Sequence, residues 1–140
     1  MSNTELLLIL IIISILSVFL YNHIFEYYYN KDPKIIELKE KISVVFPDIM
    51  KIKIFKSEGK SYTINKRKVY LCLKDEKGNY YNNNMLIYVL LHEYSHILCD
   101  EIGHTEKFHK IFDEVILKAS NEKLYNPSLS LTENYCEYKE

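Results

Sequence analysis

The sequence contains few cysteines and no tryptophan. Three cysteines, Cys72, Cys99 and Cys136, are scattered over its 140 residues. An odd number at such wide spacing argues against a small fold held together by disulfides, so all three are predicted to be reduced thiols, as in a reducing compartment. Cys99 is expected to be a buried structural thiol.

Positive charge is absent from the first 30 residues, because all 18 Lys and Arg residues follow them. A cleaved signal peptide needs positive charge before its apolar run and small residues at its cleavage site. Here Glu5 is the only charge before the apolar run, and bulky aromatic residues follow it. We therefore expect the N-terminal segment to be retained.

That segment has the length of a membrane span. Residues 6–25 are apolar apart from a few polar side chains, and about 20 such residues cross the hydrocarbon of a bilayer. We predict a short tail (1–5), a transmembrane anchor (6–25), a juxtamembrane linker (26–33) and one compact domain (34–140). The lysines that follow the span favour a single-pass protein with its C-terminal domain in the cytoplasm.

The chain also lacks a strong net charge. After residue 30 the 18 basic residues face 17 acidic ones, so the overall charge indicates no substrate class. Only the stretch 51–68 is strongly basic, with seven bases against Glu58. A solvated strand face explains this stretch, and contact with an anionic membrane surface or with nucleic acid is the alternative.

The most specific pattern is the H-E-x-x-H motif formed by His92, Glu93 and His96. Histidines four apart lie on one face of a helix and can present two nitrogens to one zinc ion, while Glu93 can reach a water on the metal. The preceding run, residues 85–91, is apolar as in a core helix, and one of the asparagines 82–84 is expected to cap it. The alternative is an accidental pattern with hydrogen-bonded histidines.

A catalytic zinc usually takes a third protein ligand. Gly103 is predicted to end the motif helix, and Thr105 to cap a second helix over residues 106–120. His104, between two helices that must pack together, is our predicted third ligand. The weaker alternatives are His109, Asp100, Glu101 and Glu106.

The motif followed by Gly103-His104 and Phe108 resembles the zinc peptidases of the WLM and SprT-like group, small relatives of the gluzincins. Residues 61–73, the motif helix and residues 126–136 are most similar to small WLM-like proteins of large DNA viruses, which implies a host or virion membrane. The resemblance implies that His92, His96 and His104 bind Zn²⁺ and that Glu93 is the general base. It also implies that Phe108 packs behind the site.

The order of elements predicts an α+β domain in which a small sheet packs on the motif helix, and the resemblance implies that this domain is zincin-like. Within it, residues 69–73 correspond to the edge strand that binds extended peptides in the resembled group. A central strand without a ligand is the equally weighted alternative. The expected elements are helices at 33–46, 85–102 and 106–120, strands at 51–56, 62–64 and 68–73, and an extended tail from residue 125.

These expectations together predict a membrane-anchored zinc metallopeptidase that acts on a protein or peptide substrate. Zn²⁺ would activate a water, and Glu93 would move its proton to the departing amine. A membrane-tethered zinc-binding scaffold without turnover is the alternative function. A protein that binds no metal is a third hypothesis.

Overall fold

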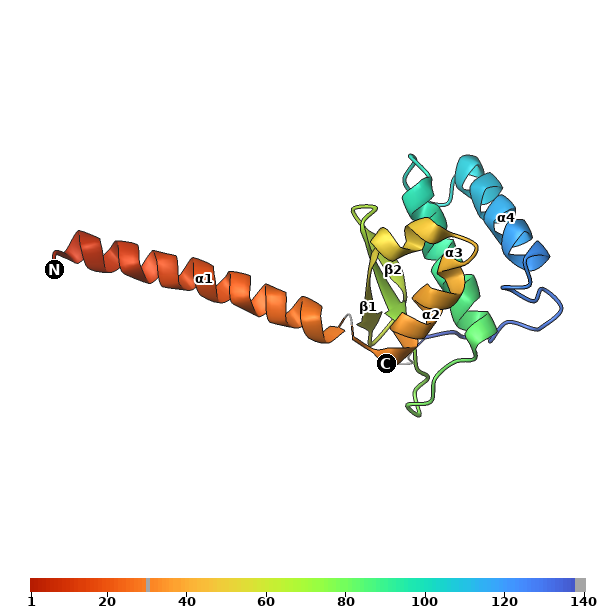
Figure 1. The fold of residues 1–140 in the computed structure, drawn as a ribbon, viewed down its shortest axis with the longest axis horizontal. Coiled ribbons are helices and arrows are strands. Elements are labelled where there is room, and N and C mark those ends of the chain that lie inside the picture. Colours follow the sequence, from red (N-terminus) through yellow and green to blue (C-terminus); the bar gives the residue numbers. More distant parts are fainter. Residues whose placement is uncertain (30, 138–140) are drawn as a thin grey trace.

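The computed structural model describes residues 1–29 and 31–137. It consists of one long helix, α1 (Asn3–Tyr29), that projects from a compact domain (Figure 1). The domain contains α2 (Pro33–Ser43), the short 3-10 helix η1 (Pro47–Lys51), β1 (Lys53–Ser57), β2 (Tyr62–Ile64), β3 (Lys68–Cys72), α3 (Asn83–Leu98) and α4 (Glu106–Asn121). This is the predicted α+β order.

α1 is apolar along most of its length, and its apolar side chains are exposed. The segment Asn3–Tyr28 is long and apolar enough to cross a membrane. This criterion rests on length and composition alone, and an N-terminal signal sequence also meets it. The structure therefore agrees with a membrane anchor, which stays a prediction.

Three side-chain caps define where the domain helices begin. Asp32 accepts a hydrogen bond from the backbone N–H of Lys34 at the start of α2. Asn82 and Thr105 do the same at the starts of α3 and α4. Such caps satisfy N–H groups that have no partner within the helix. All three positions agree with the sequence-based prediction.

The end of α3 was predicted wrongly. The helix stops at Leu98 instead of continuing to Gly103, and Cys99 already has an extended backbone. Residues 99–105 form a loop in which Gly103 adopts a φ of +83°. That conformation favours glycine, so Gly103 marks a turn within the loop.

The sheet has the order β1-β3-β2, with β1 parallel and β2 antiparallel to β3. β3 is therefore the central strand, and an edge position for residues 69–73 is excluded. The edge beside the motif helix belongs to β2. Residues 65–67 join β2 to β3, and within this turn Asn65 and Lys66 both have positive φ, which matches the right-handed twist of a tight hairpin.

The core lies between the inner face of the sheet and α3, with α2 and α4 beside α3. Ile54, Val69 and Leu71 point from the strands toward Leu86 and Leu90 of α3, and each is at most 1% exposed. Burying each such side chain contributes roughly 1.5–3 kcal/mol. This packing holds α3 against the sheet along its whole length.

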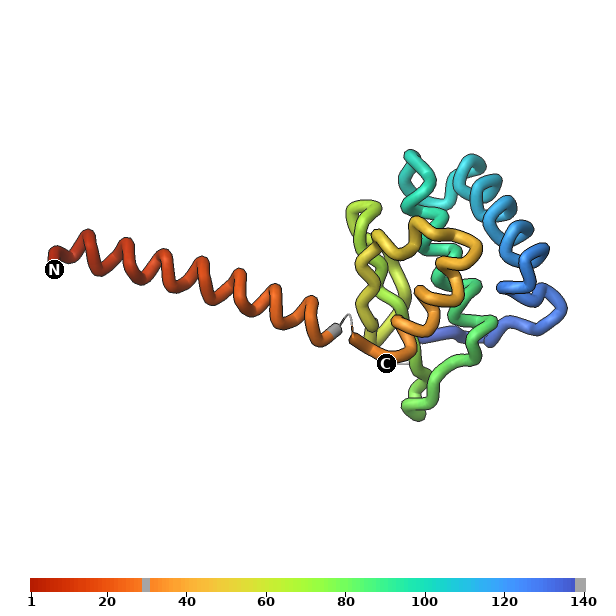
Figure 2. Tube along the Cα trace, in the orientation of Figure 1, coloured from red at the N-terminus to blue at the C-terminus, as the bar shows by residue number. Residues whose placement is uncertain are grey.

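The tail after α4 runs back across the domain toward the sheet (Figure 2). There the tail is fixed by a disulfide between Cys136 and Cys72, the last residue of β3. The predicted reduced state is wrong for these two cysteines, because tertiary packing brings together residues 64 apart in sequence. Cys99 is free and buried, as predicted. The cysteines therefore no longer support a reducing compartment.

Tyr135 strengthens the same attachment. Its hydroxyl lies 2.9 Å from Ser61 Oγ and also bonds to the carbonyl oxygen of Cys72. Leu131 and Tyr135 pack against the core, which confirms that the tail crosses the domain as an extended strap. The sequence pattern also predicts packing of Leu129 and Tyr138, but Leu129 is exposed and Tyr138 lies outside the described residues.

Candidate metal centre

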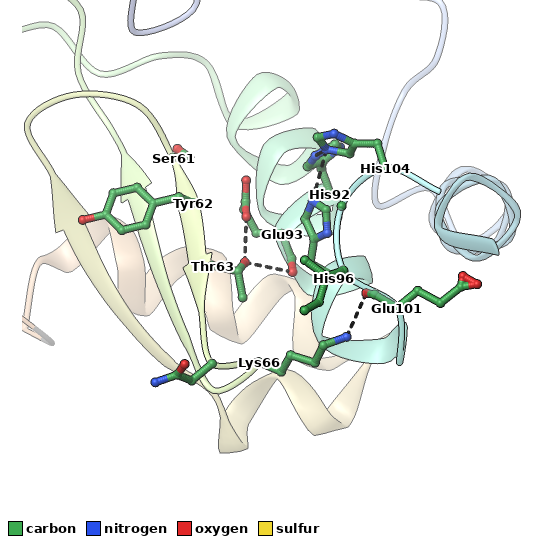
Figure 3. A pocket seen from close by; sticks show the side chains of 12 residues that line it. Ser61, Tyr62, Thr63, Lys66, His92, Glu93, His96, Glu101 and His104 are labelled. Atoms are coloured by element: carbon green, nitrogen blue, oxygen red, sulfur yellow. Dashed lines mark hydrogen bonds between the residues drawn. The ribbon is translucent and has the colours of Figure 1, made fainter. Parts of the chain in front are cut away.

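The first residues of the site lie in the second half of α3, which packs against β2. His92 and His96 are one helical turn apart and half-buried, on the side that faces α4. Glu93 points instead toward β2, where its side chain is only 6% exposed (Figure 3). Neighbouring positions on a helix point about 100° apart, so the motif directs imidazoles and carboxylate to adjacent walls of one cleft.

The loop after α3 brings His104 to the two motif histidines. The Nε2 atom of His104 lies 3.0 Å from Nε2 of His92 and 3.2 Å from Nε2 of His96. Two nitrogens bound tetrahedrally to one zinc ion at about 2.0–2.1 Å lie roughly 3.4 Å apart. The three imidazoles therefore fit a zinc ion, and they form a cluster whose ligand atoms all lie within 4.8 Å of one another.

The surroundings keep His92 and His96 neutral, which is the form that binds metals. Burial lowers the pKa of His92 to about 4, and the nearby His96, His104 and His109 add to the effect. Burial also lowers the pKa of His96, helped by His104 and Lys66. Near neutral pH, both rings can offer a nitrogen lone pair without first losing a proton.

Aromatic side chains of α4 form the wall behind the imidazoles. The ring of Phe108 stacks on that of His96, with centroids 4.1 Å apart and planes 21° apart. His92 meets Phe108 and Phe112 edge-on. Phe108 is fully buried, which agrees with the packing role that the family resemblance implied. These contacts restrict the motif histidines to one orientation.

Thr63 of β2 holds Glu93. Its hydroxyl lies 2.6 Å from Glu93 Oε2 and 3.2 Å from the Glu93 carbonyl oxygen, and its one proton is donated to the nearer acceptor, the carboxylate. Burial raises the pKa of Glu93, while the bond from Thr63 lowers it. A buried carboxylate with a raised pKa is a stronger base than an exposed one, and Thr63 fixes its direction.

Lys66, in the β2–β3 turn, bonds to the loop that carries His104. Its Nζ atom donates to the carbonyl oxygen of Glu101 at 3.0 Å and to that of Cys99. Sequence reasoning missed both Thr63 and Lys66, because a threonine in a short strand and a lysine in a turn carry no motif. The structure shows that Thr63 bonds to Glu93 of the motif and that Lys66 bonds to the loop that carries His104.

A cleft of about 530 Å³ lies between β2, α3 and this loop. Ser61, Tyr62 and Thr63 line it on the strand side, opposite the cluster formed by His92, His96 and His104 (Figure 3). Glu93 lies between the strand and the histidines. The cleft therefore gives an extended chain access to the edge of β2, the carboxylate and the three imidazoles at once.

The alternative third ligands lie outside the cluster. His109 is exposed, and its ring centroid is 6.3 Å from that of His104. Asp100 forms an ion pair with Lys107 at 2.6 Å. The side chain of Glu101 accepts a hydrogen bond from Thr105, and Glu106 is exposed on α4. In the described residues, His104 is the side chain that completes the set.

The basic stretch 51–68 is largely engaged within the protein. Lys51 and Lys56 pair with nearby carboxylates, and Lys53 and Lys68 both pair with Glu26 of α1. Lys66 holds the loop after α3. Contact with nucleic acid stays the alternative to a solvated strand face.

One solved structure has a similar fold, and several viral proteins are similar in sequence. No protein-family model matches the sequence. Wss1 from Saccharomyces cerevisiae has a similar fold, with a TM-score of 0.55 and 22% identity over 68% of this chain and 84% of Wss1. This likeness confirms the WLM-like fold that the sequence resemblance predicted. At this level of identity it establishes the fold alone.

Several viral proteins are similar in sequence. Protein 136R of Invertebrate iridescent virus 6 is 51% identical over 80 residues, which cover 55% of this chain and 45% of that protein. Protein 042R of Invertebrate iridescent virus 3 is 39% identical, covering 56% and 50%, and protein R325 of Acanthamoeba polyphaga mimivirus is 39% identical, covering 56% and 43%. The matched region thus spans half or less of each relative. The predicted similarity to viral proteins is confirmed.

Proposed function

We propose that this protein is a zinc-dependent peptidase attached to a membrane by α1. The observation that carries the proposal is the convergence of three imidazole Nε2 atoms beside a buried carboxylate, in a cleft bounded by a strand edge. The WLM-like fold shared with Wss1 supports it. The exposed apolar surface of α1 supports the membrane attachment.

His92, His96 and His104 would hold the ion. A bound zinc ion supplies Lewis acidity and a polarised water at neutral pH. Glu93 takes a proton from the attacking water and later delivers it to the nitrogen of the departing amine. Thr63 holds one oxygen of the Glu93 carboxylate, so the other oxygen can carry the proton.

The strand edge explains how a peptide would be positioned. In the described sheet β2 pairs with β3 alone, and Tyr62 and Thr63 line the cleft together with Ser61, which precedes the strand. An extended peptide can add to such an edge through main-chain hydrogen bonds, which align its carbonyl groups with little dependence on sequence. We therefore propose unfolded or extended protein segments as the substrate class.

The test combines metal analysis with a protease assay on one sample. The full chain, purified in detergent without chelators, should contain one zinc per chain and should cleave an unfolded protein. Glu93→Gln should keep the zinc and lose about 10²–10⁴-fold in turnover. Glu106→Gln, an exposed carboxylate of α4, is the matched control and should leave both unchanged.

Each other outcome has a defined meaning. Zinc without hydrolysis of any unfolded protein or peptide library would support the inactive scaffold instead. A zinc content near zero would exclude both zinc-dependent functions. Wild-type turnover by Glu93→Gln would show that the general-base role is wrong.

A further inference from the structure

The strands turn one face toward α3 and the other face outward. Ile54, Val69 and Thr63 belong to the inner face, because the first two are in the core and Thr63 bonds to Glu93. Side chains alternate along a strand, so the neighbouring positions belong to the other face. We call this set the outer face, and it comprises Lys53, Phe55, Lys68, Tyr70, Tyr62 and Ile64.

Aromatic rings run across the outer face from strand to strand. Phe55 of β1 stacks on Tyr70 of β3 with centroids 5.2 Å apart, and Tyr70 stacks on Tyr62 of β2 at 4.8 Å. Phe55 is buried, but Tyr62 is 41% and Ile64 40% exposed. At the β2 end, the outer face therefore exposes apolar and aromatic side chains on the surface of the domain.

The last turns of α1 are attached to the same face. Phe25 lies 6.4 Å from Phe55 between ring centroids. Glu26 pairs with Lys53 at 2.9 Å and with Lys68 at 3.4 Å. From this attachment α1 runs away from the domain on the sheet side, while α3 and α4 lie on the opposite side (Figure 1).

If α1 spans a bilayer, these contacts fix the position of the sheet relative to the membrane surface. The apolar run ends at about Phe25, which touches the outer face directly, so the outer face lies where the hydrocarbon ends. Tyrosine rings suit that boundary because one end is apolar and the other polar, and lysines reach from it to headgroups. The exposed Tyr62, Ile64 and lysine stems match this environment.

We propose that the outer face of the sheet rests on the headgroup layer of the membrane that α1 crosses, and that anionic lipids are its preferred partners. The proposal rests on the proposed membrane attachment. Because β2 contributes to both the cleft and the outer face, docking of the outer face also affects which substrates reach the cleft. Tyr62 lines the cleft and belongs to the outer face, so peptide segments held at the membrane surface are the ones within reach of Glu93.

The absence of tryptophan allows a direct test with single-tryptophan variants of the full chain. The reporters are Ile64→Trp on the outer face, Phe19→Trp in α1, and Leu117→Trp on α4, which is 62% exposed on the opposite side. Each is reconstituted into vesicles of phosphatidylcholine and phosphatidylserine, with or without bromine on the acyl chains. Circular dichroism melting verifies that each variant is folded.

Interfacial residues lie roughly 5–10 Å into the headgroup and acyl boundary, so brominated lipid should reduce the fluorescence of Ile64→Trp. Phe19→Trp should be quenched more, and Leu117→Trp should not change. Replacing phosphatidylserine with phosphatidylcholine should reduce the quenching at position 64, because Lys53 and Lys68 share the single charge of Glu26 and leave the outer face with a net positive charge that anionic headgroups attract.

The controls separate this proposal from the membrane anchor. Quenching at position 19 with none at position 64 would overturn the docking of the sheet and leave the anchor intact. No quenching at either position would overturn both. A response of Ile64→Trp to duplex DNA, but not to lipid, would identify the outer face as a nucleic-acid surface and overturn the proposal.

Discussion

α1 and α3 are both strongly apolar helices, but only α3 is buried. Leu86, Leu90 and Leu91 of α3 are completely inaccessible to solvent, whereas the apolar side chains of α1 are exposed throughout its central turns. Each helix also contains a serine whose hydroxyl bonds to the carbonyl four residues earlier. Ser95 bonds to Leu91 and Ser17 to Ile13, both at 2.8 Å.

The difference shows that apolar content alone does not determine what surrounds a helix. α3 is short, is capped by Asn82 and meets complementary apolar faces of the sheet, α2 and α4. α1 packs on β1 only through its last turns, so most of its apolar surface is exposed in the described structure. In α3 the same burial that stabilises the fold also surrounds the histidines and Glu93.

The largest effects are expected when a lysine is placed in the middle of each helix. Leu90→Lys places a charge among fully buried side chains, which costs several kcal/mol and should unfold the domain. Ile12→Lys should leave the melting temperature of the domain unchanged. It should instead reduce membrane insertion by roughly 2.5–3.5 kcal/mol, measured as the fraction of protein in the membrane pellet. Equal losses of melting temperature would mean that α1 belongs to a core.

The next largest effect concerns the metal that α3 is proposed to bind. His96→Ala removes one of three nitrogens and should weaken zinc binding by roughly 100-fold or more, since even indirect supports of a metal site contribute 10–100-fold. Competition with a fluorescent chelator measures this change. His109→Ala, an exposed histidine nearby, is the control and should bind zinc as the wild type does.

Lys66 should affect zinc binding less, because it acts through the loop. Lys66→Gly keeps a turn residue that accepts positive φ but removes the amine that holds the carbonyl oxygens of Cys99 and Glu101. Zinc affinity should fall by about 10-fold while the melting temperature is maintained. Lys123 also has a positive φ, so Lys123→Gly is the matched control. Equal zinc affinity in both variants would show that Lys66 does not hold the loop that carries His104.

The smallest predicted effect is the pH dependence of the zinc-free protein. His92 has a pKa of about 4 when folded and about 6.5 when unfolded, so the unfolded chain binds the proton first as the pH falls. Its contribution to stability is constant above pH 6.5 and is lost between 6.5 and about 4. Because His92 is only half-buried, solvent screening reduces this contribution, and we expect a decrease of a few degrees in melting temperature.

Comparison with His92→Gln isolates this contribution. The raised pKa of Glu93 acts in the opposite sense, because the folded state then binds that proton more readily. The difference between the two pH profiles removes the common effect of Glu93. A wild-type profile no steeper than that of His92→Gln would show that His92 is not desolvated.

Local features of the site were predictable from the sequence. Asp32, Asn82 and Thr105 cap helices through bonds to residues two or three positions away, so their roles follow from neighbouring residues. The spacing of His92 and His96 likewise follows from helical geometry. The third ligand was predicted with alternatives, and the structure selects His104 because the loop folds back over α3.

Other features depended on contacts between distant residues. The order of the sheet made β2 an edge and β3 the centre, whereas the family resemblance had matched residues 69–73 to the edge strand. The Cys72–Cys136 disulfide joins segments 64 residues apart, which spacing alone could not pair. The bond from Thr63 to Glu93 spans 30 residues.

The sequence by itself determined the long apolar helix, the helix starts and the pair of histidines one turn apart, because these depend on interactions within a few residues. Only the tertiary structure decided which strand borders the cleft, which histidine completes the cluster and which face of the sheet meets α1. Those choices depend on how separate elements pack, and the packing is set by the whole core rather than by any one segment.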